Sequence, residues 1–253
     1  MTASPFPNRT LARLRAGEAI SCLWLSLGSA ALAEIAAEQA PDAIVLDLQH
    51  GQWDSAMTHA ALAVVAAWGV TPLARVADKQ ALSIGQALDA GAAGVIVPLV
   101  DTAEEAAAVV AAAHYPPHGV RSGGGMRPLR DFPAYLAASR TEALVAVMIE
   151  TRAGLDNAAA IARTPGLDML FIGPGDLGLA LAGDGPPLET AIAAILAAAR
   201  EAGVPCGIFT SSATEARERI AQGFRFVIAA DDINLARAGF AAALSSTSQD
   251  STV

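Results

Sequence analysis

The sequence predicts an α/β fold and, within that class, a single (β/α)8 TIM barrel. Short, continuously apolar runs of strand length alternate with Ala-rich segments of helical length along the chain. The runs are apolar throughout, as expected for a parallel sheet covered by helices. About eight strand-helix units fit into the chain, the number that closes a barrel. An open, doubly wound sheet is the alternative.

We place the strands, in order, at residues 22–27, 43–48, 72–76, 94–100, 144–149, 169–172, 205–209 and 224–229, after a short N-terminal helix. Asp101-Thr102-Ala103-Glu104 is typical of a helix start, whereas Gly69, Gly91, Gly203 and Gly223 are placed to end helices just before strands. These signals predict one barrel domain over residues 1–244. The polar segment 245–253 has little to bury and is predicted to be a disordered tail.

Composition limits the function classes. The 253 residues are 53% hydrophobic and 16% charged, which favours one globular core. A net charge of −9 argues against a nucleic-acid partner, because phosphate binding needs clustered Lys and Arg. The N-terminus lacks a secretory signal pattern and no apolar run reaches roughly 18 residues, so we expect a soluble, cytoplasmic protein with no membrane contact. Cys22 and Cys206 lie in apolar runs and are expected to be buried free thiols.

Two apolar runs end in a carboxylate. Glu150 follows residues 143–149 directly, and Asp176 follows residues 169–172 after Gly173-Pro174-Gly175. The carboxyl ends of barrel strands meet at one rim, where such barrels carry their chemistry. Because charges beside buried strands are costly unless they are paired, a shared divalent cation is the first hypothesis for these two side chains.

Three more polar residues fall at strand ends on the same rim: Asp47, His50 and Arg75. Each has a structural alternative, since Asp47 could cap a turn, His50 could begin a loop and Arg75 could be an ion-pair partner. The Gly-rich stretch 115–128 is long for a connector and predicts a lid, a subunit contact or an ordinary surface loop. Its three consecutive glycines precede a strand, which is the wrong place for a dinucleotide fingerprint.

Several motifs together resemble the HpcH/HpaI family of class II pyruvate aldolases, and they occur in the family's order from about Leu23 to Leu244. They are Asp47-Leu48-Gln49-His50-Gly51, Val97-Pro98-Leu99-Val100-Asp101-Thr102-Ala103-Glu104, Tyr115-Pro116-Pro117-His118-Gly119-Val120-Arg121, Ile149-Glu150-Thr151 and Phe171-Ile172-Gly173-Pro174-Gly175-Asp176-Leu177.

The resemblance implies a barrel of the phosphoenolpyruvate/pyruvate type and a Mg²⁺, Mn²⁺ or Co²⁺ ion held by Glu150 and Asp176. It implies that the backbone N–H groups of Gly175 and Asp176 bind the carboxylate of a 2-oxoacid donor. It also implies that Arg75 faces the keto oxygen, and that His50, oriented by Asp47, is the acid-base residue. Family members assemble as trimer-based hexamers, so a homo-oligomer is expected.

The implied reaction is reversible aldol addition of a pyruvate or hydroxypyruvate donor to an aldehyde, with cleavage of 4-hydroxy-2-oxoacids in reverse. Two departures from the family pattern bear on substrate binding: Gln49 replaces a common Glu, and Met148 replaces a Gln found in some members. Phe209 is expected to shape the acceptor side. The chain has one lysine, Lys79, in a predicted rim loop, which disfavours a Schiff-base mechanism. A citrate-lyase-like acyl-CoA lyase and a noncatalytic barrel scaffold are the alternatives.

Overall fold

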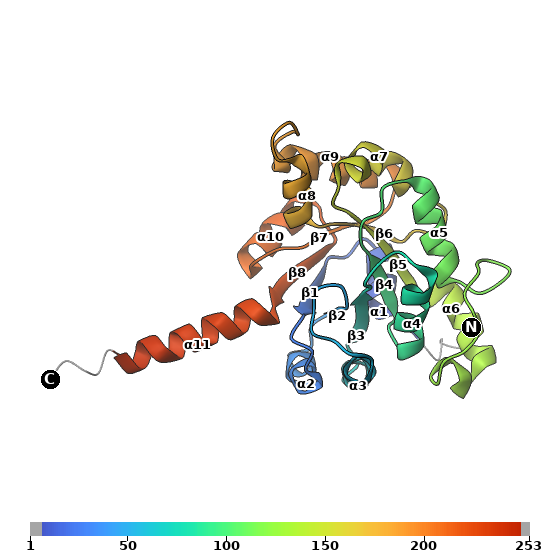
Figure 1. Cartoon of the computed structure of the whole chain (residues 1–253), viewed down its shortest axis with the longest axis horizontal. Helices are drawn as coiled ribbons and strands as arrows, with labels where there is room; N and C mark the ends of the chain where they lie inside the picture. The colour runs from blue at the N-terminus through green and yellow to red at the C-terminus, as the bar shows by residue number, and fades with distance from the viewer. Residues whose placement is uncertain (1–6, 249–253) are drawn as a thin grey trace.

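A computed structural model describes residues 7–248, with the side chains of 246–248 excepted. Eight parallel strands form a closed barrel in sequence order (Figure 1), and β1 pairs with β8 to complete the ring. The strands are β1 (Ile20–Leu25), β2 (Ala43–Asp47), β3 (Thr71–Arg75), β4 (Gly94–Val97), β5 (Leu144–Ile149), β6 (Met169–Ile172), β7 (Cys206–Ile208) and β8 (Phe226–Asp231). The predicted fold class is confirmed.

Most of the helices connect successive strands around the outside of the barrel (Figure 1). They are α1 (Arg9–Arg15), which precedes the barrel, α2 (Ala30–Glu38), α3 (Ser55–Ala67), α4 (Ala81–Ala90), α5 (Ala103–Ala113), α6 (Phe132–Glu142), α7 (Arg152–Ala162), α8 (Pro174–Leu181), α9 (Leu188–Ala202), α10 (Ala213–Gln222) and α11 (Asp232–Ser248), with a short 3-10 turn at Pro128–Arg130. None of the described helices is long and apolar enough to cross a membrane.

The predicted helix ends are confirmed. Thr102 caps α5, with its hydroxyl accepting the N–H of Glu105. Gly91, Gly203 and Gly223 end α4, α9 and α10 in the left-handed conformation. Both cysteines are buried free thiols, as expected, and burial raises the pKa of each.

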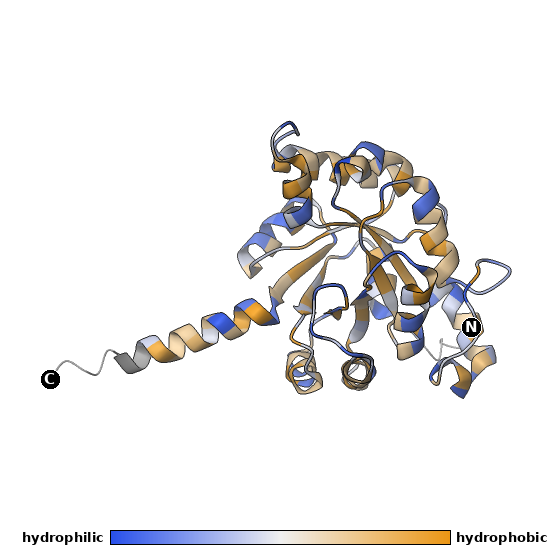
Figure 2. Ribbon diagram, in the orientation of Figure 1, coloured by the Kyte–Doolittle hydropathy of each residue, from blue (hydrophilic) through white to orange (hydrophobic). Residues whose placement is uncertain are grey.

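The core has two layers, which explains why the strands read as unbroken apolar runs. Side chains such as Leu73, Ile96 and Phe171 fill the inside of the barrel, and outward-facing side chains such as Val145 pack against the helices. Figure 2 shows the strands as the most hydrophobic part of the ribbon. With both faces covered, nearly every strand position is buried.

The fourth strand is shorter than predicted and ends at Val97 instead of residue 100. Pro98 has no N–H to donate to a neighbouring strand, and Leu99 turns the backbone into the left-handed region with φ 57°. This turn places the Leu99 backbone at the carboxyl rim, where the site described below uses it.

The last helix, α11, projects away from the barrel (Figure 1). It contacts the barrel through β1 and β8, while Leu235, Phe240 and Leu244 along it are 56%, 72% and 70% exposed. The helix runs to Ser248, so residues 245–248, predicted as tail, are helical. The rest of the predicted tail, 249–253, lies outside the described residues.

Candidate active site

Glu150 and Asp176 lie at the carboxyl rim of the barrel on neighbouring elements. Glu150 directly follows β5 and is 2% exposed, and Asp176 sits in the first turn of α8, just after β6. The Oε1 atom of Glu150 accepts the Leu99 N–H at 2.8 Å, whereas its Oε2 atom is buried and has no hydrogen-bond partner. The carboxylate of Asp176 is exposed and makes no hydrogen bond within the described part of the chain.

The surroundings of the Glu150 carboxylate favour a bound cation. Burial raises its pKa, and the negative charge of Asp176 raises it further, against the Leu99 N–H bond and the charge of Arg75. A buried carboxylate oxygen without a partner is costly unless a positive charge satisfies it. Over residues 7–248 no cluster of three or more His, Cys, Asp or Glu side chains could hold a metal. Two carboxylates fit an ion of the Mg²⁺ or Mn²⁺ kind that takes its other oxygens from substrate and water.

Arg75 and Asp47 form a buried ion pair at the ends of β3 and β2, where the two residues are register partners. The pair is bidentate: Arg75 Nε donates to Oδ1 at 2.8 Å and Nη2 donates to Oδ2 at 2.6 Å. Burial opposes ionisation of Asp47, but the bonds and charge of Arg75 outweigh it, so its pKa lies below the usual value. The remaining Arg75 nitrogen, Nη1, has no partner among the described residues and is available to a ligand.

The structure relates Asp47 to His50 through the backbone. Asp47 Oδ1 accepts the backbone N–H groups of Gln49 and His50, each at 3.1 Å. The His50 side chain is exposed, and within the described residues its ring makes no bond to Asp47. Asp47 therefore fixes the main chain at His50 and makes no hydrogen bond to the His50 ring. The amide oxygen of Gln49 is buried without a partner. Gly51 is required, since a Cβ there would lie 2.3 Å from the Asp47 carbonyl oxygen.

An aromatic group lies beside the ion pair, and its centre, Trp24, was missed by the sequence reasoning. The indole Nε1 donates to Asp47 at 3.3 Å, and the Arg75 guanidinium lies over the ring at 5.0 Å from its centroid. Phe209 meets Trp24 edge to face at 5.5 Å, and Phe171 stacks on it at 5.9 Å. The position of the large aromatic residue Trp24 within the first predicted strand was the signal in the sequence that could have indicated its place at the site. Phe209 and Arg75 thus contact the same indole ring, and the role of Phe209 on the acceptor side stays a prediction.

The turn from β6 into α8 lies next to Glu150 and carries Asp176. Gly173 is the N-cap of α8, and the first N–H groups of a helix have no partner inside the helix. The N–H groups of Gly175 and Asp176, in the first turn of α8, are among these. A Cβ at Gly175 would meet nothing within 4 Å, so there is open space above it. A Cβ at Gly173 would lie 2.4 Å from Oε2 of Glu150, which puts this glycine against the unpartnered oxygen.

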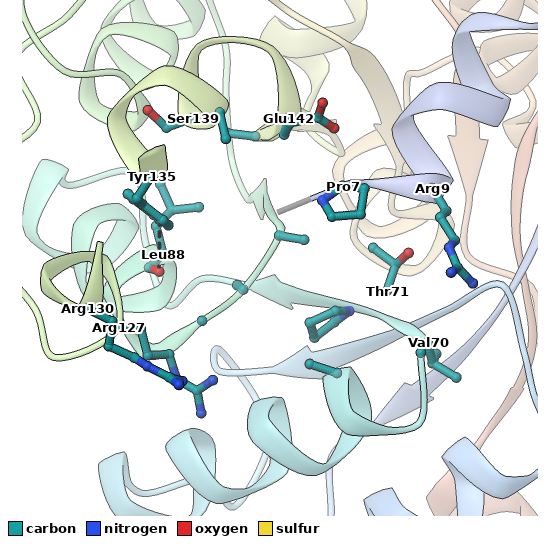
Figure 3. Close-up of a pocket in the computed structure, with 18 of the residues that line it drawn as sticks. Pro7, Arg9, Val70, Thr71, Leu88, Arg127, Arg130, Tyr135, Ser139 and Glu142 are labelled. Carbon is teal, nitrogen blue, oxygen red and sulfur yellow. Dashed lines mark hydrogen bonds between the residues drawn. The ribbon is translucent and has the colours of Figure 1, made fainter. Parts of the chain in front are cut away.

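A cavity lies elsewhere, at the amino ends of β3, β4 and β5. It has a volume of about 700 Å³ and is lined by residues including Thr71, Arg127, Tyr135 and Glu142 (Figure 3). Arg121, from the same loop as Arg127, is instead buried against Asp89 and packs on the rings of Tyr115 and Tyr135. Neither arginine joins the rim carboxylates.

Comparisons with known proteins agree with this geometry. A model of the family described as HpcH/HpaI aldolase/citrate lyase matches residues 20–238. A hydroxypyruvate/pyruvate aldolase of Rhizorhabdus wittichii is 39% identical over 218 residues, covering 83% of this chain and 86% of that protein. A 5-keto-4-deoxy-D-glucarate aldolase of Salmonella arizonae is 33% identical over 246 residues, covering 94% and 96%.

A crystal structure of an HpcH/HpaI aldolase/citrate lyase family protein from Burkholderia cenocepacia superposes with a TM-score of 0.89. It is 34% identical, and the match covers 95% of this chain and 99% of that one. Full-length similarity in sequence and in fold thus accompanies the arrangement of residues at the rim. The chain belongs to the HpcH/HpaI aldolase/citrate lyase family of carbon–carbon lyases.

Proposed function

We propose that the protein is a divalent-metal-dependent aldolase that adds a 2-oxoacid donor to an aldehyde and cleaves 4-hydroxy-2-oxoacids in reverse. The observation that carries the proposal is the buried, unpartnered Oε2 of Glu150 beside a second carboxylate, Asp176, at the rim. The fixed positive charge of Arg75 acts on the same Glu150 carboxylate. Mg²⁺, Mn²⁺ and Co²⁺ all accept such oxygen ligands.

When bound, the metal acts as a Lewis acid that polarises the keto group of the donor. Glu150 and Asp176 hold it, and the backbone N–H groups of Gly175 and Asp176 bind the donor carboxylate. Negative charge develops on the keto oxygen as a C3 proton leaves or as the carbon–carbon bond breaks. Arg75 stabilises that charge without reorganising, because Asp47 fixes two of its three nitrogens. In cleavage, the His50 ring takes the proton of the C4 hydroxyl, through a water.

The donor we propose is pyruvate or hydroxypyruvate, the two compounds in the names of relatives that are 36% and 39% identical to this chain. Met148 borders the donor side, because its methyl group lies 3.0 Å from where a Cβ of Gly173 would stand. A thioether offers no strong hydrogen bond, so Met148 gives the donor an apolar wall. Trp24 and Phe209 form the aromatic side of the site, which we assign to the acceptor aldehyde.

Proton–deuterium exchange at C3 of the donor tests the proposal without knowledge of the acceptor. Pyruvate and hydroxypyruvate are each incubated in D₂O with Mg²⁺, Mn²⁺ or Co²⁺, then with EDTA, and followed by NMR. Exchange that needs the metal and is lost in Glu150→Gln supports a class II aldolase and ranks the donors. Absence of exchange with both donors and all three metals would contradict the proposal and favour an acyl-CoA lyase or a noncatalytic barrel.

We further propose a homo-oligomer, trimeric or hexameric, in which α11 packs on a second copy of the chain. A large exposed side chain such as Phe240 on a projecting helix is costly in water. On the two strands that this helix contacts, Ser21 and Leu23 of β1 and Ala229 of β8 are also incompletely buried. Light scattering after size exclusion should give a multimer for the wild type and a smaller species for Phe240→Glu. A monomeric wild type would refute the assignment.

A further inference from the structure

We propose that Lys79, the only lysine of the chain, is a positioning residue: with Glu105 it fixes the turn at residues 98–102 so that the Leu99 N–H points at Glu150. The proposal deepens the proposed function, since it takes Glu150 to be a metal ligand. Lys79 comes from the loop between β3 and α4, and Glu105 from the first turn of α5. The contacts of Lys79 thereby link three segments: the loop after β3, the turn at residues 98–102 and the first turn of α5.

The turn needs external support because of Leu99. Its φ of 57° lies in the left-handed region, which residues other than Gly, Asn and Asp rarely adopt. Leu99 is 44% exposed as a residue, so burial does not account for the conformation. Strained residues of this kind persist only where their surroundings over-determine them, and they gather at functional sites.

The support comes from both sides of the turn. Lys79 Nζ donates to the Leu99 carbonyl oxygen at 3.2 Å and forms an ion pair with Glu105 Oε1. Glu105 Oε2 accepts the Asp101 N–H at 2.8 Å. On the far side, the Thr151 hydroxyl donates to the Asp101 carboxylate, and Asn157 Nδ2 donates to the Asp101 carbonyl at 2.8 Å.

The turn places the Leu99 N–H within hydrogen-bond distance of Oε1 of Glu150. The Leu99 N–H is the hydrogen-bond partner of the Glu150 carboxylate within the described residues; it bonds to Oε1, and Oε2 is left without a partner. Lys79 bonds to the carbonyl oxygen of the same residue whose N–H meets Glu150, so a change in the Leu99 backbone angles alters both contacts. Lys79 thus has a role at the site without forming a Schiff base.

The test uses Lys79→Met, which keeps most of the aliphatic stem, and Lys79→Arg, which keeps the charge. Arg163→Met is the matched control, because the Arg163–Glu201 ion pair lies at the ends of α7 and α9, away from the rim. Two quantities are measured: exchange of the Leu99 amide with water in the metal-free, ¹⁵N-leucine-labelled protein, and Mn²⁺ affinity by electron paramagnetic resonance.

Lys79→Met should speed Leu99 amide exchange by at least about tenfold and weaken Mn²⁺ binding by roughly 3- to 10-fold, the size expected for a half-exposed charged contact. Lys79→Arg should show nearly wild-type Leu99 amide exchange and Mn²⁺ affinity, and Arg163→Met should change neither quantity. If Lys79→Met does not fold, Glu105→Gln, which removes the charge paired with Lys79, supplies the same two measurements.

Unchanged exchange and unchanged Mn²⁺ affinity in Lys79→Met would overturn the proposal, as would equal changes in Arg163→Met. A wild-type protein that does not bind Mn²⁺ would instead refute the metal site. In that case Leu99 amide exchange, measured without metal, still decides whether Lys79 fixes the turn.

Discussion

Replacing Gly173 with alanine tests the geometry of the carboxylate site most directly. The new Cβ would lie 2.4 Å from Oε2 of Glu150, whereas ordinary contact begins at about 3.4 Å. The φ of Gly173 is −95°, which alanine adopts freely, so the clash with Glu150 is the perturbation. The Glu150 carboxylate must retreat by about 1 Å, which is enough to break a 2.8 Å hydrogen bond to Leu99.

We expect Gly173→Ala to weaken Mn²⁺ binding by about 10- to 100-fold, since a misplacement of about 1 Å at a site costs on that order. Overpacking should also lower the stability of the metal-free protein by about 1–3 kcal/mol, or about 2–4 °C in Tm for each kcal/mol in a chain of this size. Titration calorimetry with Mn²⁺ and thermal unfolding by circular dichroism measure the two effects.

Gly175→Ala is the matched control, two residues along in the same turn. Its Cβ would meet nothing within 4 Å, and alanine is the better helix former by about 1 kcal/mol. Its Mn²⁺ affinity and Tm should equal or exceed those of the wild type. If Gly173→Ala binds Mn²⁺ as tightly as Gly175→Ala does, the inference that Glu150 is fixed beside Gly173 as a metal ligand is refuted.

Three further outcomes are expected. His50→Ala should keep Mn²⁺ binding but lower aldol turnover by about 10²–10⁴-fold, and wild-type turnover would remove His50 from the mechanism. Asp176→Asn should abolish donor C3 exchange and weaken Mn²⁺ binding, because one of two carboxylate ligands loses its charge; full exchange would contradict the site. Asp47→Asn leaves Arg75 buried and unpaired and should cost about 3–5 kcal/mol of stability near neutral pH. Because the pKa of Asp47 is lowered by folding, its contribution is present above about pH 4 and lost as the pH falls through the lowered value. Acid titration by circular dichroism should therefore give a flatter profile for Asp47→Asn between about pH 4 and pH 2, and a profile as steep as that of the wild type would argue against the pairing.

The order and type of the strands could be predicted because a doubly covered parallel strand has to be apolar along its whole length. Strand ends were less accessible, as β4 illustrates: residues 98–100 are as apolar as the strand before them, but Pro98 lacks an N–H and Leu99 adopts a positive φ. The course of α11 could not be predicted either, since its departure from the barrel depends on contacts beyond neighbouring residues.

The site residues could be placed at one rim from their positions at the ends of predicted strands. In the structure, Asp47 and Arg75 are register partners at the ends of neighbouring parallel strands. The structure confirms the structural alternative for Arg75, which is an ion-pair partner of Asp47, and the functional role of Arg75 stays a prediction that rests on its unpartnered Nη1. The bond from Leu99 to Glu150 was not predictable, because it joins residues 51 apart and depends on a backbone angle.

The separation of the cavity at the amino ends of the strands from the carboxyl rim matters for any search for inhibitors. A compound that fills the 700 Å³ space between Thr71 and Tyr135 would raise the melting temperature simply by binding the folded chain. It would leave Glu150 and Asp176, at the other end of the barrel, open to metal and donor. Thermal-shift hits on this protein should therefore be sorted by competition with Mn²⁺ or pyruvate before any is taken as an active-site ligand.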